Sequence, residues 1–176
     1  MTNRRAAFLD RDGTIIEDEG YVRSPDQVQL RPGAAEAIAR LRAASFTVIV
    51  VTNQSGIARG LFGWPEYRAV AARLDALLQA AGTSLDATYV CPHHPDYTGA
   101  CQCRKPALQL YREAEAEWNL DLRGSVWIGD QARDVEPALA LGGRGFLIDP
   151  GRTAVVPGVA MVPSLAEAVG AVVPSR

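Results

Sequence analysis

Short apolar runs alternate along the chain with longer segments in which apolar residues recur at helical spacing. The runs are typical of buried strands and comprise residues 6–9, 46–51, 86–90, 126–130 and 145–148. The segments of helical pattern comprise residues 34–44, 65–81, 106–118 and 134–141, followed by a short helix at 164–172. Strands that alternate with helices predict right-handed βαβ units and a parallel sheet. We therefore expect an α/β fold with a central parallel sheet.

The sequence also predicts the buried face of one helix, one long loop and the character of the C-terminal tail. In the segment 65–81 one helical face collects residues that we interpret as core: Tyr67, Val70, Leu74, Leu77, Leu78 and Ala81. The connection 15–30 is polar and irregular, and connections of this length are often functional or mobile. The C-terminal tail carries Pro150, Pro157, Pro163 and Pro174, so we expect it to be looser than the rest.

Length, composition and charge narrow the class of protein. The 176 residues suit one domain, and with 48% apolar residues they can form a sizeable core. A net charge of −2 gives no reason to expect nucleic acid or an anionic membrane as a partner. No apolar run is long enough to cross a bilayer, and the N-terminus leads into a strand-like run rather than a signal peptide. We therefore expect a single domain (residues 1–176) that is monomeric and cytoplasmic.

Polar residues that suit a phosphate site stand where the expected strands end. Asp10 and Asp12 follow the first run, Thr52 follows the second, and Asp130 ends the fourth. The carboxyl ends of parallel strands meet at one sheet edge, where ligands bind in open α/β folds. Carboxylates held close together repel one another unless a cation lies among them, and oxygen ligands favour Mg²⁺. With Lys105 added, the pattern predicts a phosphate site with its own nucleophile, although the first motif alone also fits an ordinary strand-to-turn junction.

The three cysteines of the chain lie within thirteen residues and indicate a metal site. Together with one histidine they provide four ligands of the kind that hold structural zinc: Cys91, His93, Cys101 and Cys103. An odd number of clustered cysteines fits zinc in a reducing compartment better than a disulfide framework, and three unrelated buried thiols are the alternative. This zinc-binding loop, residues 91–103, would follow the third strand and hold the segment that delivers Lys105. His94 fits a supporting or surface role better than that of a ligand.

Four short motifs occur in a characteristic order along the chain. They are Asp10-x-Asp12-Gly13-Thr14, Thr52-Asn53-Gln54, Lys105-Pro106 and Gly129-Asp130-x3-Asp134. This set resembles the signature motifs of the haloacid dehalogenase superfamily of phosphotransferases, and the resemblance extends from residue 6 to about residue 148. It implies a Rossmann-like three-layer fold. Because no large insertion interrupts the chain, we expect no separate cap domain and a site open to a bulky phosphate ester.

The resemblance also implies roles for the motif residues. Asp10 would attack phosphorus and form an aspartyl-phosphate, and Asp12 would protonate the leaving alkoxide and then deprotonate the attacking water. Thr52 and Lys105 would bind the phosphoryl group in transit. Asp10, the backbone carbonyl of Asp12 and Asp130 would hold the catalytic Mg²⁺, whereas the zinc would be structural.

The zinc-binding loop and the run 55–60 narrow the resemblance to small phosphatases that remove the 7-phosphate of a heptose 1,7-bisphosphate. Phosphatases of histidinol phosphate are the nearest alternative. The substrate contacts that this resemblance implies are Asp18, Glu19, Gly20, Tyr21, Thr52, Asn53, Gln54, Ser55, Arg104, Lys105 and Gln131. Arg59 and Arg104 would donate to the second phosphate, with a solvated surface position as the alternative for each. Gln131 replaces the lysine or arginine often found there, which leaves the preferred anomer and sugar open.

Two questions stay open at this point. Asp134 would either support the site or cap the following helix. A zinc-stabilised binding module without activity is an alternative from another functional class, and it predicts a lost nucleophile or a basic surface. Asp10 is present and the chain is slightly acidic, so the pattern favours an enzyme that acts on a small sugar phosphate.

Overall fold

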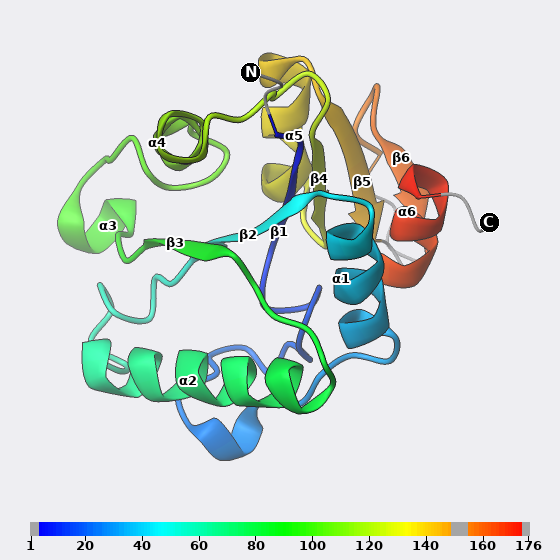
Figure 1. Cartoon of the computed structure of the whole chain (residues 1–176). Coiled ribbons are helices and arrows are strands. Elements are labelled where there is room, and N and C mark those ends of the chain that lie inside the picture. Colours follow the sequence, from blue (N-terminus) through cyan, green and yellow to red (C-terminus); the bar gives the residue numbers. More distant parts are fainter. Residues whose placement is uncertain (1–3, 149–154, 174–176) are drawn as a thin grey trace.

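Strand β1 lies in the interior of a six-stranded parallel sheet, since all four of its residues are apolar and buried. The computed structural model describes residues 4–148 and 155–173. Its strands are β1 (Ala6–Leu9), β2 (Thr47–Asn53), β3 (Ala87–Cys91), β4 (Val126–Gly129), β5 (Arg144–Ile148) and β6 (Ala160–Val162). Their order is β3-β2-β1-β4-β5-β6, so the chain winds outward from β1 in both directions (Figure 1). The carboxyl ends of β1, β2 and β4 therefore lie side by side.

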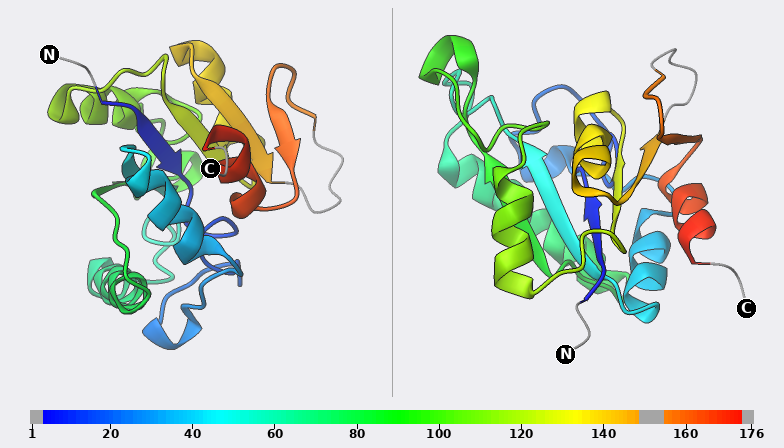
Figure 2. Two further views of the ribbon diagram at one scale, coloured as in Figure 1. Left: turned by 45° about the vertical axis from the view of Figure 1, so that its right-hand side comes forward. Right: turned by 90° about the horizontal axis from the view of Figure 1, so that it is seen from above.

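Helices cover both faces of this sheet and complete three layers (Figure 2). They are α1 (Ala34–Ala43), α2 (Trp64–Ala80), α3 (Pro95–Thr98), α4 (Gln109–Trp118), α5 (Ala132–Leu141) and α6 (Leu165–Val172), with a short 3-10 helix η1 (Pro25–Gln27). Side chains alternate across a strand, so Ala7 and Leu9 of β1 pack with α1, α2 and α6. Ala6 and Phe8 pack with α4 and α5 on the other face.

Most of the element predictions are confirmed, with differences that have physical causes. The fold class is the one predicted. The predicted start of a helix at Pro106 is wrong: α4 begins at Gln109, because residues 104–108 form turns that carry Lys105 into the site. Ala81 is not core, since α2 ends at Ala80 and Ala81 is exposed. Strand β6 was not predicted because it has only three residues, which is too short for a recognisable alternation.

The C-terminal part is more ordered than a loose tail where the structure describes it. Helix α6 is capped by Ser164, whose hydroxyl accepts a hydrogen bond from the backbone N–H of Glu167, and it packs against α1. The predicted loose positions Pro150 and Pro174 lie outside the described residues.

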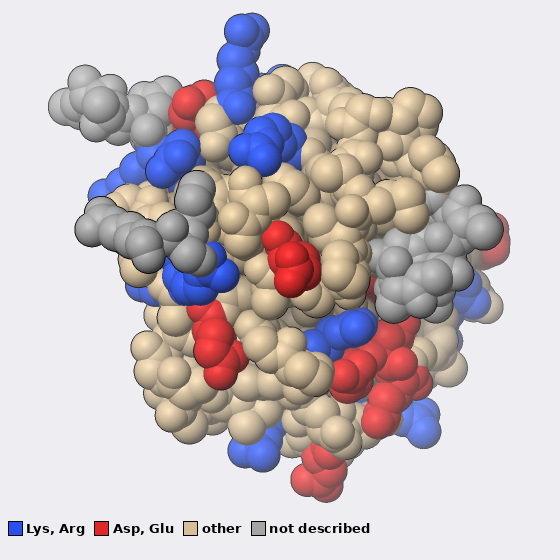
Figure 3. All heavy atoms as spheres, turned by 90° about the vertical axis from the view of Figure 1, so that its right-hand side faces the viewer, with Lys and Arg blue, Asp and Glu red and all other residues tan. Residues whose placement is uncertain are grey.

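The segments that connect the strands add little structure outside the three layers. Within residues 4–148 and 155–173, no segment between the strands forms a cap domain. The longest loop runs from β1 to α1 and contains only η1 and isolated bridges. Across the same ranges, every helix is too short or too polar to cross a membrane. On the face shown in Figure 3, acidic and basic side chains are interspersed with broad uncharged areas.

Candidate active site

A polar cavity of about 320 Å³ opens at the carboxyl edge of the sheet. Its walls consist of Asp10, Asp12, Asp18, Gly20, Tyr21, Asn53, Gln54, Ser55, Arg104, Lys105, Asp130, Gln131, Arg133 and Asp134. These residues come from the ends of β1, β2 and β4, the loop after β1, the segment before α4 and the first turn of α5. Most of the sequence-predicted site residues are therefore brought together around one opening.

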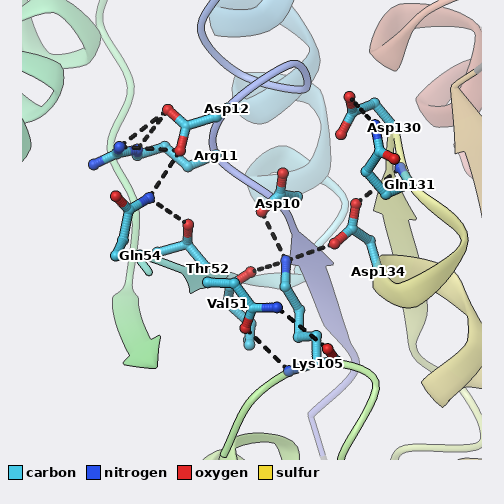
Figure 4. A network of polar contacts seen from close by, with 11 residues as sticks. Asp10, Arg11, Asp12, Val51, Thr52, Gln54, Lys105, Asp130, Gln131 and Asp134 are labelled. Atoms are coloured by element: carbon cyan, nitrogen blue, oxygen red, sulfur yellow. Dashed lines mark hydrogen bonds and ion pairs between the residues drawn. The ribbon is translucent and has the colours of Figure 1, made fainter. Parts of the chain in front are cut away.

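Lys105 occupies the floor of the cavity between two carboxylates (Figure 4). Its Nζ lies 2.7 Å from Asp10 Oδ1 and 2.8 Å from Asp134 Oδ1, and it donates a third bond of 2.6 Å to the carbonyl oxygen of Val51. Only 2% of the Lys105 side chain is exposed. An ammonium group has three protons to donate, so every one has an acceptor here. The cation is thus fixed beside the predicted nucleophile.

Asp134 fills both roles left open by its sequence position. Its Oδ2 accepts a 2.9 Å hydrogen bond from the backbone N–H of Gln131 and so caps α5, while its Oδ1 pairs with Lys105. One buried carboxylate therefore ties the start of α5 to the cation on the cavity floor. The side-chain amide of Gln131 donates a 3.0 Å bond to Asp130 Oδ2.

Burial and neighbouring charges together shift the pKa values of this cluster. Burial, followed by the negative charges of Asp134 and Asp12, raises the pKa of Asp10 to about 7 despite the Lys105 ammonium. Burial also raises the pKa of Asp130. Burial alone would lower the pKa of Lys105, but the carboxylates of Asp10 and Asp134 outweigh it and raise that pKa, so Lys105 stays protonated. The site therefore holds several carboxylates around the single ammonium of Lys105, and a second cation bound among them would stabilise it.

Three of these carboxylates are close enough to bind a metal ion together. Asp10, Asp130 and Asp134 each offer an oxygen, and all three atoms lie within 4.8 Å of one another. Two glycines permit this approach. A Cβ on Gly13, whose φ is +82°, would stand 2.5 Å from Asp130 Oδ2, and a Cβ on Gly129 would stand 2.3 Å from the Cβ of Asp134. An alanine at either position would push the carboxylates apart.

Asp12 is oriented differently from Asp10. It is paired with the buried guanidinium of Arg11 at 3.0 Å, and its Oδ2 accepts a 2.8 Å bond from Gln54 Nε2. The same amide group donates to Thr52 Oγ1 at 2.9 Å, which leaves the hydroxyl proton of Thr52 free to donate. Thr52 is buried behind the cavity wall. Gln54 therefore connects the predicted proton carrier to the predicted phosphoryl ligand.

The segment that carries Arg104 and Lys105 is docked onto the end of β2. The Asn53 side chain accepts a 3.0 Å hydrogen bond from the backbone N–H of Lys105 and donates a 3.2 Å bond to its carbonyl oxygen. Arg104 donates from Nη1 to the carbonyl oxygen of His93. Both contacts join the lysine segment to neighbouring structure, one to the sheet and one to the cysteine loop.

The four predicted zinc ligands converge at one point beside β3. The three sulfur–sulfur distances are 3.1, 3.5 and 3.8 Å, and Nδ1 of His93 lies 3.2 Å from the sulfur of Cys103 and 3.8 Å from that of Cys91. Tetrahedral zinc with Zn–S bonds of about 2.3 Å places its sulfurs about 3.8 Å apart. One sulfur pair has this spacing and the other two lie closer together, and the three thiols and one imidazole are the donor types that zinc prefers. None of the three cysteines forms a disulfide.

Besides the buried Thr52, two predicted substrate contacts, Arg59 and Glu19, do not line the cavity. The guanidinium of Arg59 packs over the Tyr97 ring, 5.1 Å from its centroid, and its Nη2 lies 2.8 Å from His94 Nε2. Arg59 therefore links the loop after β2 to α3 rather than facing the cavity. Glu19 is exposed and accepts a 3.4 Å bond from Gln27. His94 lies outside the ligand cluster, as expected from the sequence, because its Nδ1 accepts from the backbone N–H of Asp96.

Sequence reasoning missed two arginines of the site. Arg11 was passed over because it stands between the two motif aspartates, yet it is 2% exposed and pairs with Asp12. Arg133 lines the cavity from the first turn of α5. The sequence contains a signal for Arg133: a cation in the first turn of a helix is electrostatically unfavourable, which suggests a role other than helix stability.

The chain is similar to known hydrolases, among them phosphatases. A family model described as haloacid dehalogenase-like hydrolase matches residues 6–142. D-glycero-beta-D-manno-heptose-1,7-bisphosphate 7-phosphatase from Yersinia pestis is 41% identical over 140 residues, which cover 77% of this chain and 74% of that protein. The crystal structure of D,D-heptose 1,7-bisphosphate phosphatase from B. bronchiseptica, complexed with magnesium and phosphate, has a TM-score of 0.86 and 35% identity, and the match covers 95% of this chain and 97% of that one. The chain belongs to the haloacid dehalogenase-like hydrolases.

Proposed function

We propose that the protein is a Mg²⁺-dependent phosphatase that removes the 7-phosphate of D-glycero-D-manno-heptose 1,7-bisphosphate. The observation that carries the chemistry is the Lys105 ammonium fixed 2.7 Å from Asp10 Oδ1 on the floor of an open polar cavity. The relatives named heptose bisphosphate phosphatases, at about 40% identity, support the substrate. The products are inorganic phosphate and heptose 1-phosphate.

The reaction takes place in two displacements. Asp10 attacks phosphorus, the bond from phosphorus to the sugar oxygen breaks, and Asp12 gives its proton to that oxygen. Water then attacks the aspartyl-phosphate, Asp12 takes up one of its protons, and Asp10 is regenerated as phosphate leaves. Lys105 and the hydroxyl of Thr52 neutralise charge on the phosphoryl oxygens in both steps. Asp12 must first exchange a contact with Arg11 or Gln54 for one with the substrate.

Two metal ions fit the donor groups of this chain. Asp10, Asp130 and the backbone carbonyl of Asp12 would hold Mg²⁺, with Asp134 kept on Lys105 by its ion pair. Bound Mg²⁺ would supply charge neutralisation for the phosphoryl group. Cys91, His93, Cys101 and Cys103 would hold a structural zinc ion. Thiols kept free for a metal suit a reducing compartment, which supports a cytoplasmic location.

The substrate contacts that we propose lie around the rim of the cavity. Asp18, Gly20 and Tyr21 line it on the side of the loop after β1, and Tyr21 is 41% exposed and available to a sugar ring. Ser55 and Arg104 line the side of β2 and the lysine segment. Because no cap covers this rim among the described residues, an extended bisphosphate has room to enter.

Steady-state turnover of competing substrates tests this proposal. The purified protein with Mg²⁺ should release phosphate from the α or β anomer of the heptose 1,7-bisphosphate with a kcat/KM at least 100-fold above that for histidinol phosphate. A preference for histidinol phosphate would overturn the substrate assignment. Failure to hydrolyse either, with both metals bound, would favour a binding module without activity.

Removal of zinc should slow turnover and loosen the lysine segment. We expect treatment with 1,10-phenanthroline, with Mg²⁺ held constant, to lower kcat at least tenfold, because the bond from Arg104 to the carbonyl oxygen of His93 joins the segment that carries Lys105 to the cysteine loop. Amide hydrogen exchange over residues 101–106 should rise at the same time. The variant Cys101→Ser should behave like the zinc-depleted protein, whereas His94→Gln should keep one zinc per chain. Full activity and unchanged exchange without zinc would contradict the structural role.

A further inference from the structure

The cavity contains more negative than positive side chains, which makes each cation important for an anionic substrate. Five carboxylates line it, from Asp10, Asp12, Asp18, Asp130 and Asp134. Its cations are Arg104, Lys105 and Arg133. A sugar bisphosphate brings two separate groups of negative charge, and only one of them is transferred. The other needs donors away from the nucleophile.

Two of the three cations are already engaged. Lys105 is shared between Asp10 and Asp134 on the floor, and Arg104 donates one bond to the carbonyl oxygen of His93. Arg133 is exposed and has no hydrogen bond or ion pair to any residue that the structure describes. It is therefore the cavity cation whose full donor set is available to a ligand.

The position of Arg133 is unfavourable for helix stability. It lies in the first turn of α5 (Ala132–Leu141), where the positive end of the helix dipole disfavours a cation. The neighbouring carboxylate of Asp134 forms no ion pair with Arg133, and its oxygens are bonded to Lys105 and to the backbone N–H of Gln131. Arg133 thus has no stabilising partner in the described structure, and an anionic ligand would provide one.

The direction of Arg133 follows from its neighbour. Consecutive residues of a helix point about 100° apart, and Asp134 is buried against the cavity floor whereas Arg133 is exposed. Since both line the same cavity, Arg133 contributes to its rim. A group bound there lies away from the phosphoryl group that reacts between Asp10 and Lys105.

We propose that Arg133 is a specificity-determining residue that binds the phosphate that is not removed. The guanidinium can donate two parallel hydrogen bonds to phosphate oxygens. This inference rests on the proposed function, because it requires a substrate with two phosphates. It predicts that Arg133 selects bisphosphates over monophosphates and has little influence on the chemical step.

Kinetics with a matched pair of substrates test this role. For Arg133→Gln we expect KM for heptose 1,7-bisphosphate to rise roughly tenfold and the ratio of kcat/KM between heptose 1,7-bisphosphate and heptose 7-phosphate to fall by a similar factor. Arg133→Lys should keep part of the selectivity, because it keeps the charge but not the paired donors. The melting temperature of Arg133→Gln should equal or exceed that of the wild type, which separates lost binding from misfolding.

Arg73→Gln is the control, since it removes the same charge from an exposed position of α2 outside the cavity. It should leave the substrate ratio unchanged. A wild-type protein that does not hydrolyse the heptose bisphosphate would overturn the proposed function, and this inference with it. If the wild type is active and Arg133→Gln keeps the wild-type ratio, with kcat/KM for both substrates unchanged or lowered by the same factor, this inference alone would be overturned.

Discussion

Asp10→Asn should lower kcat for the heptose bisphosphate by at least about 1000-fold, because the amide cannot attack phosphorus to form the acyl phosphate. The replacement has nearly the same shape, and Lys105 keeps its bonds to Asp134 and to the carbonyl oxygen of Val51. The variant should therefore fold. Two measurements test this: phosphate release should fall by that factor, and no phosphorylated protein should be detected.

The same variant has an expected effect on stability that depends on pH. Burial and the charge of Asp134 raise the pKa of Asp10 to about 7 in the folded chain. Between about pH 4 and pH 7 the folded state therefore holds a proton that the unfolded state has lost, so stability without Mg²⁺ falls as the pH rises through this window. Asp10→Asn removes this dependence. Without Mg²⁺ it should melt above the wild type at pH 8, with the difference narrowing toward pH 5.

An exposed aspartate provides the control for activity. Asp75→Asn on α2 removes a carboxylate outside the cavity and should retain wild-type kcat. Turnover by Asp10→Asn within tenfold of the wild type would exclude Asp10 as the nucleophile. A lower melting temperature of Asp10→Asn at pH 8 would instead show that the Lys105 ion pair outweighs burial and the neighbouring charges.

The sequence predicts the residues at the strand ends better than it predicts the contacts that bring residues from distant loops to them. Asp10 could be placed because four apolar residues before it leave little alternative to a buried strand, and Gly13 marks the turn that follows. Lys105 is different, because its position depends on the Asn53 side chain, 52 residues away, which holds its backbone. Periodicity encodes which face of an element is buried and contains no information on such a contact.

The direction in which a side chain points is the second feature of the site that the hydrophobic pattern of the sequence does not predict. Arg59 follows Ser55 closely in sequence, yet the loop turns its guanidinium to Tyr97 and His94, whereas Arg133 reaches the cavity. Which arginine faces the site depends on loop conformation and on the rotation of α5, and both are fixed by tertiary packing. The cysteine cluster was predictable because its ligand types are specific and close together in the chain.

Lys105→Met should cost both activity and stability. We expect kcat to fall at least 100-fold, because the buried ammonium that neutralises the phosphoryl group is lost. The free energy of unfolding at pH 8 should fall by about 3–5 kcal/mol, since Asp10 and Asp134 would lose the cation that pairs with them in a buried position. For a chain of this size, that corresponds to a melting temperature lower by roughly 10 °C.

A double variant separates the two effects of Lys105. In Lys105→Met/Asp134→Asn one of the unpaired carboxylates is also removed, so part of the lost stability should return, whereas kcat should stay at the level of the single variant. This follows because Asp134 acts on the site through Lys105 and the cap of α5, while the ammonium lies beside Asp10, where the phosphoryl group would bind. Thermal unfolding and phosphate release, measured without and with Mg²⁺, give both quantities. Recovery of kcat in the double variant would show that Lys105 serves only to balance Asp134, and a single variant as stable as the wild type would show that the buried carboxylates do not need it.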